Sequence, residues 1–154
     1  MDRLLSYYYK LLRELHYDFL RYIYFKIDKN SRMIGLTGPG GTTLILQHIK
    51  KDLNPAEAIY VTAEDFYFAD NKLLDLADEL VKKGIKYLFV YEIRKYKDWS
   101  KELKLIYDYH PELKVRFTGS SVLDINKGAS DLSRRAVMYR MQGLSFREYL
   151  QLFH

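Results

Sequence analysis

Short apolar runs alternate along the chain with longer segments in which apolar positions recur every three or four residues. A run of about five residues, rich in β-branched and aromatic side chains, predicts a strand that is buried on both faces. Five such runs occur, at 33–37, 58–62, 87–90, 114–118 and 136–139. Because strands and helical segments alternate over most of the length, the pattern predicts an α/β fold with a mainly parallel sheet.

The segments between the runs predict helices. One helix is expected over about 4–27, and its buried stripe would comprise Leu5, Leu12, Leu15, Phe19, Tyr22 and Ile23. Others are expected at about 42–53, at 72–83 behind an Asn71 cap, at 99–109, and after a Ser145 cap. We therefore expect an N-terminal helical segment, 1–30, packed on a three-layer core, 31–154, with helices on both faces of about five strands. The last helix meets the C-terminus without a stop signal, which indicates a truncated core.

The composition of the chain excludes several classes of protein. The 154 residues are enough for one domain with a core, and the absence of Cys excludes disulfides and thiolate metal sites. No apolar run approaches the ~18–20 residues that span a bilayer, and the charged N-terminus is not typical of a signal peptide. We expect a cytoplasmic protein with no membrane partner. The net charge of +5 permits an anionic partner, but acidic residues lie among the Lys and Arg, so a nucleic-acid-binding module is the least favoured function.

Glycine and polar residues follow three of the expected strands. Gly38-Pro39-Gly40-Gly41-Thr42-Thr43 follows the first strand, Glu92 follows the third, and Ser120 lies just after the fourth. Ligands of open α/β sheets bind at the carboxyl ends of the strands, so we expect these residues to line one site. A tight turn with a Thr-capped helix, a solvated Glu92 and a structural turn at 118–121 are the alternatives.

The first of these strand ends has the setting of a P-loop, which is a strand, a glycine-rich turn and a helix. A P-loop has four residues between its first Gly and a Gly-Lys pair. Here only Pro39 separates Gly38 from Gly40, and Gly41 stands where the lysine belongs. The helix that follows still offers free N–H groups and a positive dipole end to an anion.

Taken in order, four motifs resemble the AAA+ ATPases among the P-loop NTPases. They are GPGGTT, YLFVYEI at 87–93, FTGSS at 117–121 and GLSFREYL at 143–150, with DLSRRAV at 131–137 as an arginine-bearing segment. The set is most similar to a prokaryotic AAA+ group in which an uncharacterised C-terminal domain follows the ATPase core. The resemblance covers about residues 30–153.

The resemblance implies ATP and Mg²⁺ as cofactors and gives each motif a role. Thr42 would ligate Mg²⁺, Glu92 would polarise the attacking water, Thr118 or Ser120 would sense the phosphate, and Arg134 or Arg135 would contact a phosphate, either in the same chain or across a subunit interface. The family has a Walker A lysine where this chain has Gly41, and a Walker B aspartate where it has Tyr91. That lysine reaches the β- and γ-phosphates and that aspartate holds the Mg²⁺ shell.

Both departures predict a loss of function. Hydrogen bonds to charged groups contribute ~1.5–3 kcal/mol each, so losing the lysine and several loop N–H groups should weaken affinity on the order of 10²–10⁴-fold. We expect a domain that binds ATP weakly or not at all and does not hydrolyse it. The alternative is a nucleotide-independent scaffold that binds a further copy or a missing C-terminal domain, in which case the Tyr-rich first helix could be an interface.

Overall fold

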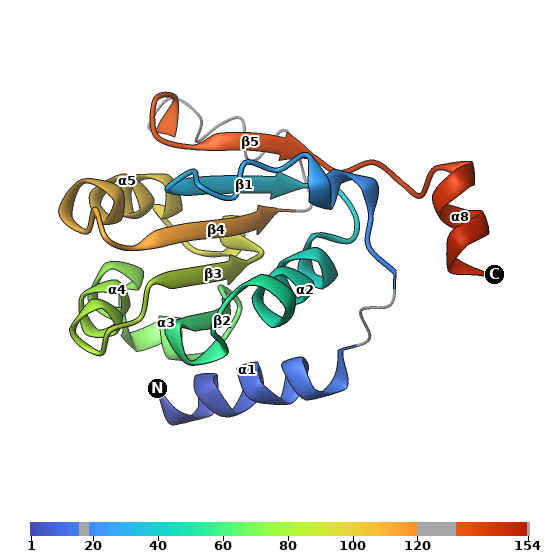
Figure 1. Cartoon of the computed structure of the whole chain (residues 1–154). Helices are drawn as coiled ribbons and strands as arrows, with labels where there is room; N and C mark the ends of the chain where they lie inside the picture. The colour runs from blue at the N-terminus through green and yellow to red at the C-terminus, as the bar shows by residue number, and fades with distance from the viewer. Residues whose placement is uncertain (16–18, 120–131, 154) are drawn as a thin grey trace.

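The structure is a computed structural model, and it describes residues 1–15, 19–119 and 132–153. The described strands form one five-stranded parallel sheet in the order β2-β3-β4-β1-β5 (Figure 1). Their bounds are β1 Met33–Thr37, β2 Ala58–Thr62, β3 Tyr87–Tyr91, β4 Lys114–Gly119 and β5 Val137–Arg140. The predicted α/β fold with a parallel sheet is therefore confirmed, and the fifth strand lies one residue later than expected.

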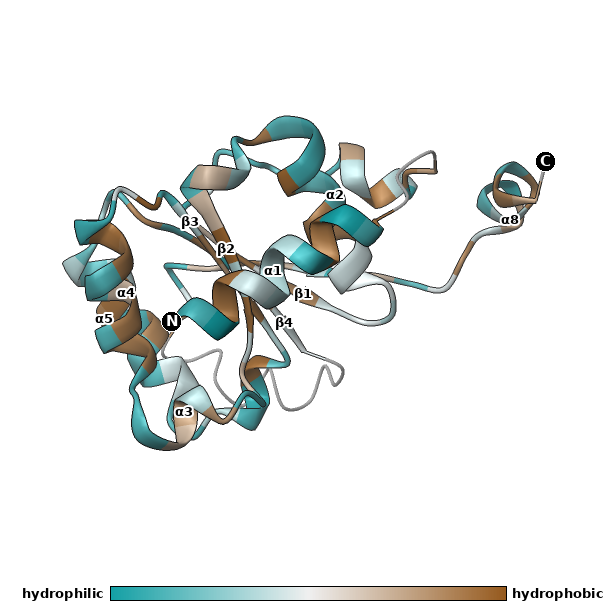
Figure 2. Cartoon of the chain, turned by 90° about the horizontal axis from the view of Figure 1, so that it is seen from below, coloured by the Kyte–Doolittle hydropathy of each residue, from teal (hydrophilic) through white to brown (hydrophobic). Residues whose placement is uncertain are grey.

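Helices cover both faces of the sheet, as predicted. The helices α1 Asp2–Glu14 and α2 Gly41–Asp52 lie together on one side, and α4 Leu73–Lys82 and α5 Trp99–Tyr109 lie together on the other (Figures 1 and 2). Two shorter helices are α3 Tyr67–Asp70 and α8 Phe146–Leu152, and the 3₁₀ turns are η1 Tyr22–Phe25, η2 Pro55–Glu57 and η3 Ile93–Lys95. The order of β1 beside β4 places the carboxyl ends of β1, β3 and β4 at one edge.

The prediction of one helix over 4–27 is wrong. The helix α1 ends at Glu14, and a separate 3₁₀ turn, η1, begins at Tyr22. The buried positions of α1 are Leu4, Tyr8 and Leu12, which repeat every four residues and differ from the expected stripe except at Leu12. The Tyr8 hydroxyl is buried and donates a hydrogen bond to the Pro55 carbonyl at 2.9 Å, so this helix covers the outer strand β2.

The cap expected at Asn71 is also wrong. The N-cap of α4 is Lys72, which makes no capping side-chain bond. Instead, the Leu73 N–H donates to the Tyr96 hydroxyl at 3.0 Å, and the Leu74 N–H donates to the Glu102 carboxylate at 3.1 Å. The free N–H groups at the start of this helix are thus bonded by side chains that come later in the chain. The sequence around the helix start does not predict these partners.

The C-terminal helix is capped as expected. The Ser145 hydroxyl accepts a hydrogen bond from the Glu148 N–H, and the Glu148 carboxylate accepts one from the Ser145 N–H, which is a capping box. Among the described residues, no helix has the length and apolar character needed to cross a membrane. The division at residue 30 and the truncation of the core stay predictions.

Candidate functional site

Three residues connect β1 to α2. The strand ends at Thr37 and the helix begins at Gly41, so Gly38, Pro39 and Gly40 make the whole turn. Gly38 and Gly40 have φ values of 93° and 90°, in the left-handed region that favours glycine. This glycine connection, residues 38–40, is therefore a tight turn with a defined conformation.

A hollow of about 490 Å³ opens beside the glycine connection, at the carboxyl ends of β1, β3 and β4. Its volume is within the usual range of small-molecule sites, about 300–1,000 Å³. The residues that line it are Gly38, Pro39, Gly40, Gly41, Thr42, Thr43, Tyr91, Glu92, Thr118 and Gly119. The structure thus brings together the glycine-rich residues, Glu92 and Thr118, which sequence placed at one site.

Glu92 is held in place by its backbone. Its φ is 53°, and its N–H donates a hydrogen bond to the Thr118 hydroxyl at 3.2 Å, which ties the end of β3 to β4. Its carboxylate lies 3.5 Å from the Arg94 Nε, and only 11% of the Glu92 side chain is exposed. The backbone of Glu92 is therefore tied to Thr118, and its carboxylate is partly balanced by Arg94.

Two further hydroxyl-bearing residues of the hollow, Tyr91 and Thr42, both lie against Tyr60. Tyr91 stacks on Tyr60 with the ring centroids 6.3 Å apart. The Tyr60 hydroxyl interacts with Thr42, and burial raises the pKa of that hydroxyl, which keeps it protonated. The side chain of Thr42 therefore lies beside a neutral core tyrosine.

The remaining predicted site residues lie elsewhere. Arg135 forms a two-pronged ion pair with Asp108 of α5, at 3.0 and 3.3 Å, and does not line the hollow. Arg134 is exposed and does not line it either. Their role at a phosphate of a neighbouring subunit stays a prediction. Ser120 lies outside the described residues.

Three residues that the sequence did not predict pack at or near the glycine connection, namely Met141, Arg21 and Glu148. The Met141 N–H donates to the Thr37 carbonyl at 2.6 Å, so the chain that leaves β5 lies directly against the turn. Arg21 places a terminal guanidinium nitrogen 3.2 Å from where a Cβ on Gly40 would lie. Arg21 also donates from Nε to Glu148 at 2.9 Å. The capping-box spacing of Ser145 and Glu148 was the one local signal, and it gave no hint of Arg21.

Glu148 is a buried, charged anchor. Burial favours its neutral form, but hydrogen bonds from the Tyr22 and Ser145 N–H groups and from Arg21 outweigh this effect and lower its pKa to about 2. The carboxylate is therefore ionised over the whole physiological range. The contribution of the ionised Glu148 to the free energy of unfolding is complete above the ordinary glutamate pKa. It is lost as the pH falls from there towards 2.

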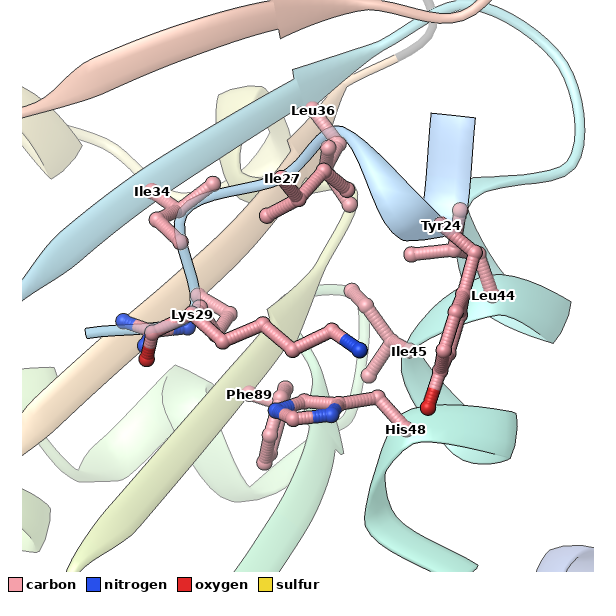
Figure 3. A pocket seen from close by; sticks show the side chains of 10 residues that line it. Tyr24, Ile27, Lys29, Ile34, Leu36, Leu44, Ile45, His48 and Phe89 are labelled. Atoms are coloured by element: carbon pink, nitrogen blue, oxygen red, sulfur yellow. The ribbon is translucent and has the colours of Figure 1, made fainter. Parts of the chain in front are cut away.

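A separate cavity of about 20 Å³ lies between α2 and the segment before β1 (Figure 3). Figure 3 shows Lys29 extending towards Tyr24, beside His48. Asp52 accepts hydrogen bonds from Lys29 at 3.1 Å and from Tyr24, and pairs with His48 Nδ1 at 2.9 Å. Burial lowers the pKa of His48, so the ring is neutral at pH 7. The cavity is mostly apolar and has room for about one water molecule, so it is a packing feature rather than a substrate site.

No group of three or more potential metal ligands occurs among residues 1–15, 19–119 and 132–153. The hollow at the strand ends is consequently the one feature of the described chain that combines the size, the position and the predicted residues of a ligand site. The fold and this hollow define a P-loop NTPase-like α/β domain.

The comparisons identify the family. The family described as "AAA domain" matches residues 28–150, which is most of the chain, so the chain belongs to it. The Uncharacterized protein MJ1637 of Methanocaldococcus jannaschii is 30% identical over 165 residues, which covers 97% of this chain and 34% of that protein. The chain therefore spans about a third of the length of this curated relative.

Solved structures agree on the fold. The Hsp104–ADP complex of S. cerevisiae matches with a TM-score of 0.58 and 18% identity, over 97% of this chain and 26% of that one. PCH-2 of C. elegans matches with a TM-score of 0.51 and 16% identity, over 94% and 43% of the two chains. The resemblance to AAA+ domains is thus confirmed for family and fold.

The glycine connection yields a stability prediction. In Gly38→Ala the new Cβ would lie 2.0 Å from the Met141 carbonyl oxygen, and the alanine would also have to adopt a positive φ. We expect a loss of roughly 3 kcal/mol or more in the free energy of unfolding, measured by urea titration. Gly84→Ala is the matched control, because Gly84 has a φ of 80° but no atom within 4 Å of a Cβ. It should lose only about 1–2 kcal/mol. Equal losses in the two variants would contradict the close backbone contact.

Proposed function

We propose that this chain is an AAA domain that retains the position of the nucleotide site but not its phosphate chemistry. It binds ATP weakly or not at all, and it does not hydrolyse ATP. The observation that carries the proposal is the lining of the hollow. Among the described residues that line it, Glu92 supplies a carboxylate and none is a Lys, Arg or His. A lining of this kind offers no positive charge to attract a triphosphate.

The length of the glycine connection supports the proposal. A P-loop wraps its backbone N–H groups around the phosphates, and this needs the four residues between the first Gly and the Gly-Lys pair. Here Gly38, Pro39 and Gly40 are the entire turn, and Pro39 has no N–H to donate. The turn is also fixed by Met141, so it cannot swing out to form a cradle without breaking that contact.

The residues that would hold Mg²⁺ do not fit it well. Magnesium prefers carboxylates, phosphate oxygens and water in an octahedral arrangement. Tyr91 stands where the resemblance implies an aspartate and stacks on Tyr60, and Thr42 lies beside the same tyrosine. Among the described residues that line the hollow, Glu92 alone could balance the charge of the ion, so this set of residues does not make a magnesium site.

The positive charge near the turn does not replace the lysine. Arg21 lies beside Gly40 but is not among the residues that line the hollow. Its guanidinium is paired with the buried carboxylate of Glu148, at 2.9 Å. Most of its charge is therefore already compensated before any anion arrives.

Calorimetric titration of Mg-ATP into the chain tests the proposal. The comparison is a variant rebuilt to the full P-loop spacing, with four residues between Gly38 and a new Gly-Lys pair ahead of Thr42, together with Tyr91→Asp. We expect the native chain to bind on the order of 10²–10⁴-fold more weakly than the rebuilt one. If the rebuilt chain does not fold, the native chain decides alone, because a dissociation constant of about 10 μM or tighter would contradict the proposal.

A second candidate function is a nucleotide-independent scaffold that associates with another copy of itself. The specific observation is α8, which stands away from the sheet in Figures 1 and 2. Phe146, Tyr149, Leu150 and Phe153 recur on one face of it, and Phe146 and Phe153 are 74% and 65% exposed. Apolar faces of this kind are typical of protein–protein contacts.

Sedimentation velocity over a range of concentrations tests this second candidate. The double variant Phe146→Ser, Phe153→Ser should remove concentration-dependent association, because it places hydroxyls on the apolar face of α8. Phe66→Ser is the control, since Phe66 is 84% exposed but lies after β2, on another element. A native chain that is monomeric at every concentration, or association that survives the double variant, would rule the scaffold out.

A further inference from the structure

The segment between β5 and α8 crosses the glycine connection. Two backbone contacts fix it there: the Met141 N–H donates to the Thr37 carbonyl at 2.6 Å, and the Met141 carbonyl oxygen would lie 2.0 Å from a Cβ on Gly38. In Figure 1 the chain leaves β5, passes the start of this turn and continues outward to α8. Met141 therefore lies directly on the turn, and the residues that follow lead from it to α8.

The Met141 side chain fills the space above the turn. It is 2% exposed. Its terminal methyl lies 3.5 Å from the Cβ position of Gly40, and its sulfur lies 3.8 Å from that of Gly41. Methionine is flexible enough to fill irregular gaps. A shortened turn leaves such a gap, and this side chain occupies it.

Both ends of the segment are fastened by the same arginine. Arg21 donates one hydrogen bond from Nε to the Glu148 carboxylate and another from its terminal nitrogen to the Gln142 carbonyl. The Tyr22 N–H adds a third bond, to Glu148, at 2.9 Å. Arg21 is 16% exposed in its side chain and Glu148 is 6% exposed, so water competes little for the bonds to Glu148, whereas the bond to Gln142 is exposed.

We propose that residues 141–148 form a strap, fastened by Arg21 through Gln142 and Glu148, that holds the glycine connection in its closed conformation. The strap makes α8 and the hollow a single coupled unit. A partner that draws α8 away from the body would pull on Glu148, lift Met141 and free the turn. The strap holds the turn in this conformation whether or not a nucleotide binds in the hollow.

Hydrogen exchange followed by mass spectrometry on the full chain tests the strap. Glu148→Gln keeps the shape of the side chain but removes its charge and weakens the bonds from Arg21 and Tyr22. We expect exchange about tenfold faster or more in peptides that cover 37–46 as well as in those that cover 141–153. Peptides from β3 and β4 should be unchanged. Glu57→Gln is the control, because Glu57 pairs with Lys86 in an exposed ion pair at 3.1 Å, and it should alter neither region.

The outcomes are distinct. Faster exchange only in 141–153 would overturn the proposal, because Glu148 would then hold α8 without holding the turn. If Glu148→Gln loosens the whole chain, Met141→Ala decides. It should speed exchange in 37–46 and leave 146–153 protected, and an unchanged turn would overturn the strap.

Nucleotide binding separates this inference from the proposed function. Glu148→Gln titrated with Mg-ATP should bind no better than the native chain, because opening the turn restores neither the lysine nor the missing residues. Strong binding by Glu148→Gln together with faster exchange in 37–46 would uphold the strap and contradict the proposed loss of phosphate chemistry.

Discussion

The contact between Met141 and the turn at 38–40 is the constraint on which the functional edge of this domain depends. The turn has three residues, two of them glycines with positive φ, and the carbonyl of Met141 lies where any side chain on Gly38 would have to be. Glycine adopts these positive φ values readily, and Met141 packs into the space that a side chain would otherwise need. The length of the turn, its glycines and the path of residues 141–148 are therefore parts of one packing solution.

The shape of the site and its ability to bind phosphate depend on different features of the structure. Parallel strands in the order β2-β3-β4-β1-β5 place the ends of β1, β3 and β4 together, and this alone produces a hollow of about 490 Å³. Affinity for a triphosphate requires positive charge and free N–H groups inside such a hollow. Two described cations lie close to it, and both are paired: Arg94 with Glu92 and Arg21 with Glu148.

The sequence predicted those features that depend on local pattern. Strands at 33–37 and 58–62 were placed to the residue, because a strand buried on both faces needs a continuous apolar run. The convergence of the glycine-rich turn with Glu92 followed from the rule that ligands meet strand carboxyl ends. The single helix predicted over 4–27 was wrong: α1 ends at Glu14, and Arg21 bonds to Glu148, a contact that no local period encodes. Met141 was missed for the same reason.

Steady-state turnover of Mg-ATP by the full chain, measured beside Glu92→Gln, tests the loss of phosphate chemistry most directly. The account predicts no turnover above background in either protein, because the described residues that line the hollow offer neither a cation for the phosphates nor a complete set of magnesium ligands. Turnover on the order of 1 s⁻¹ or more in the native chain, abolished by Glu92→Gln, would contradict it and would make the shortened turn a working phosphate site.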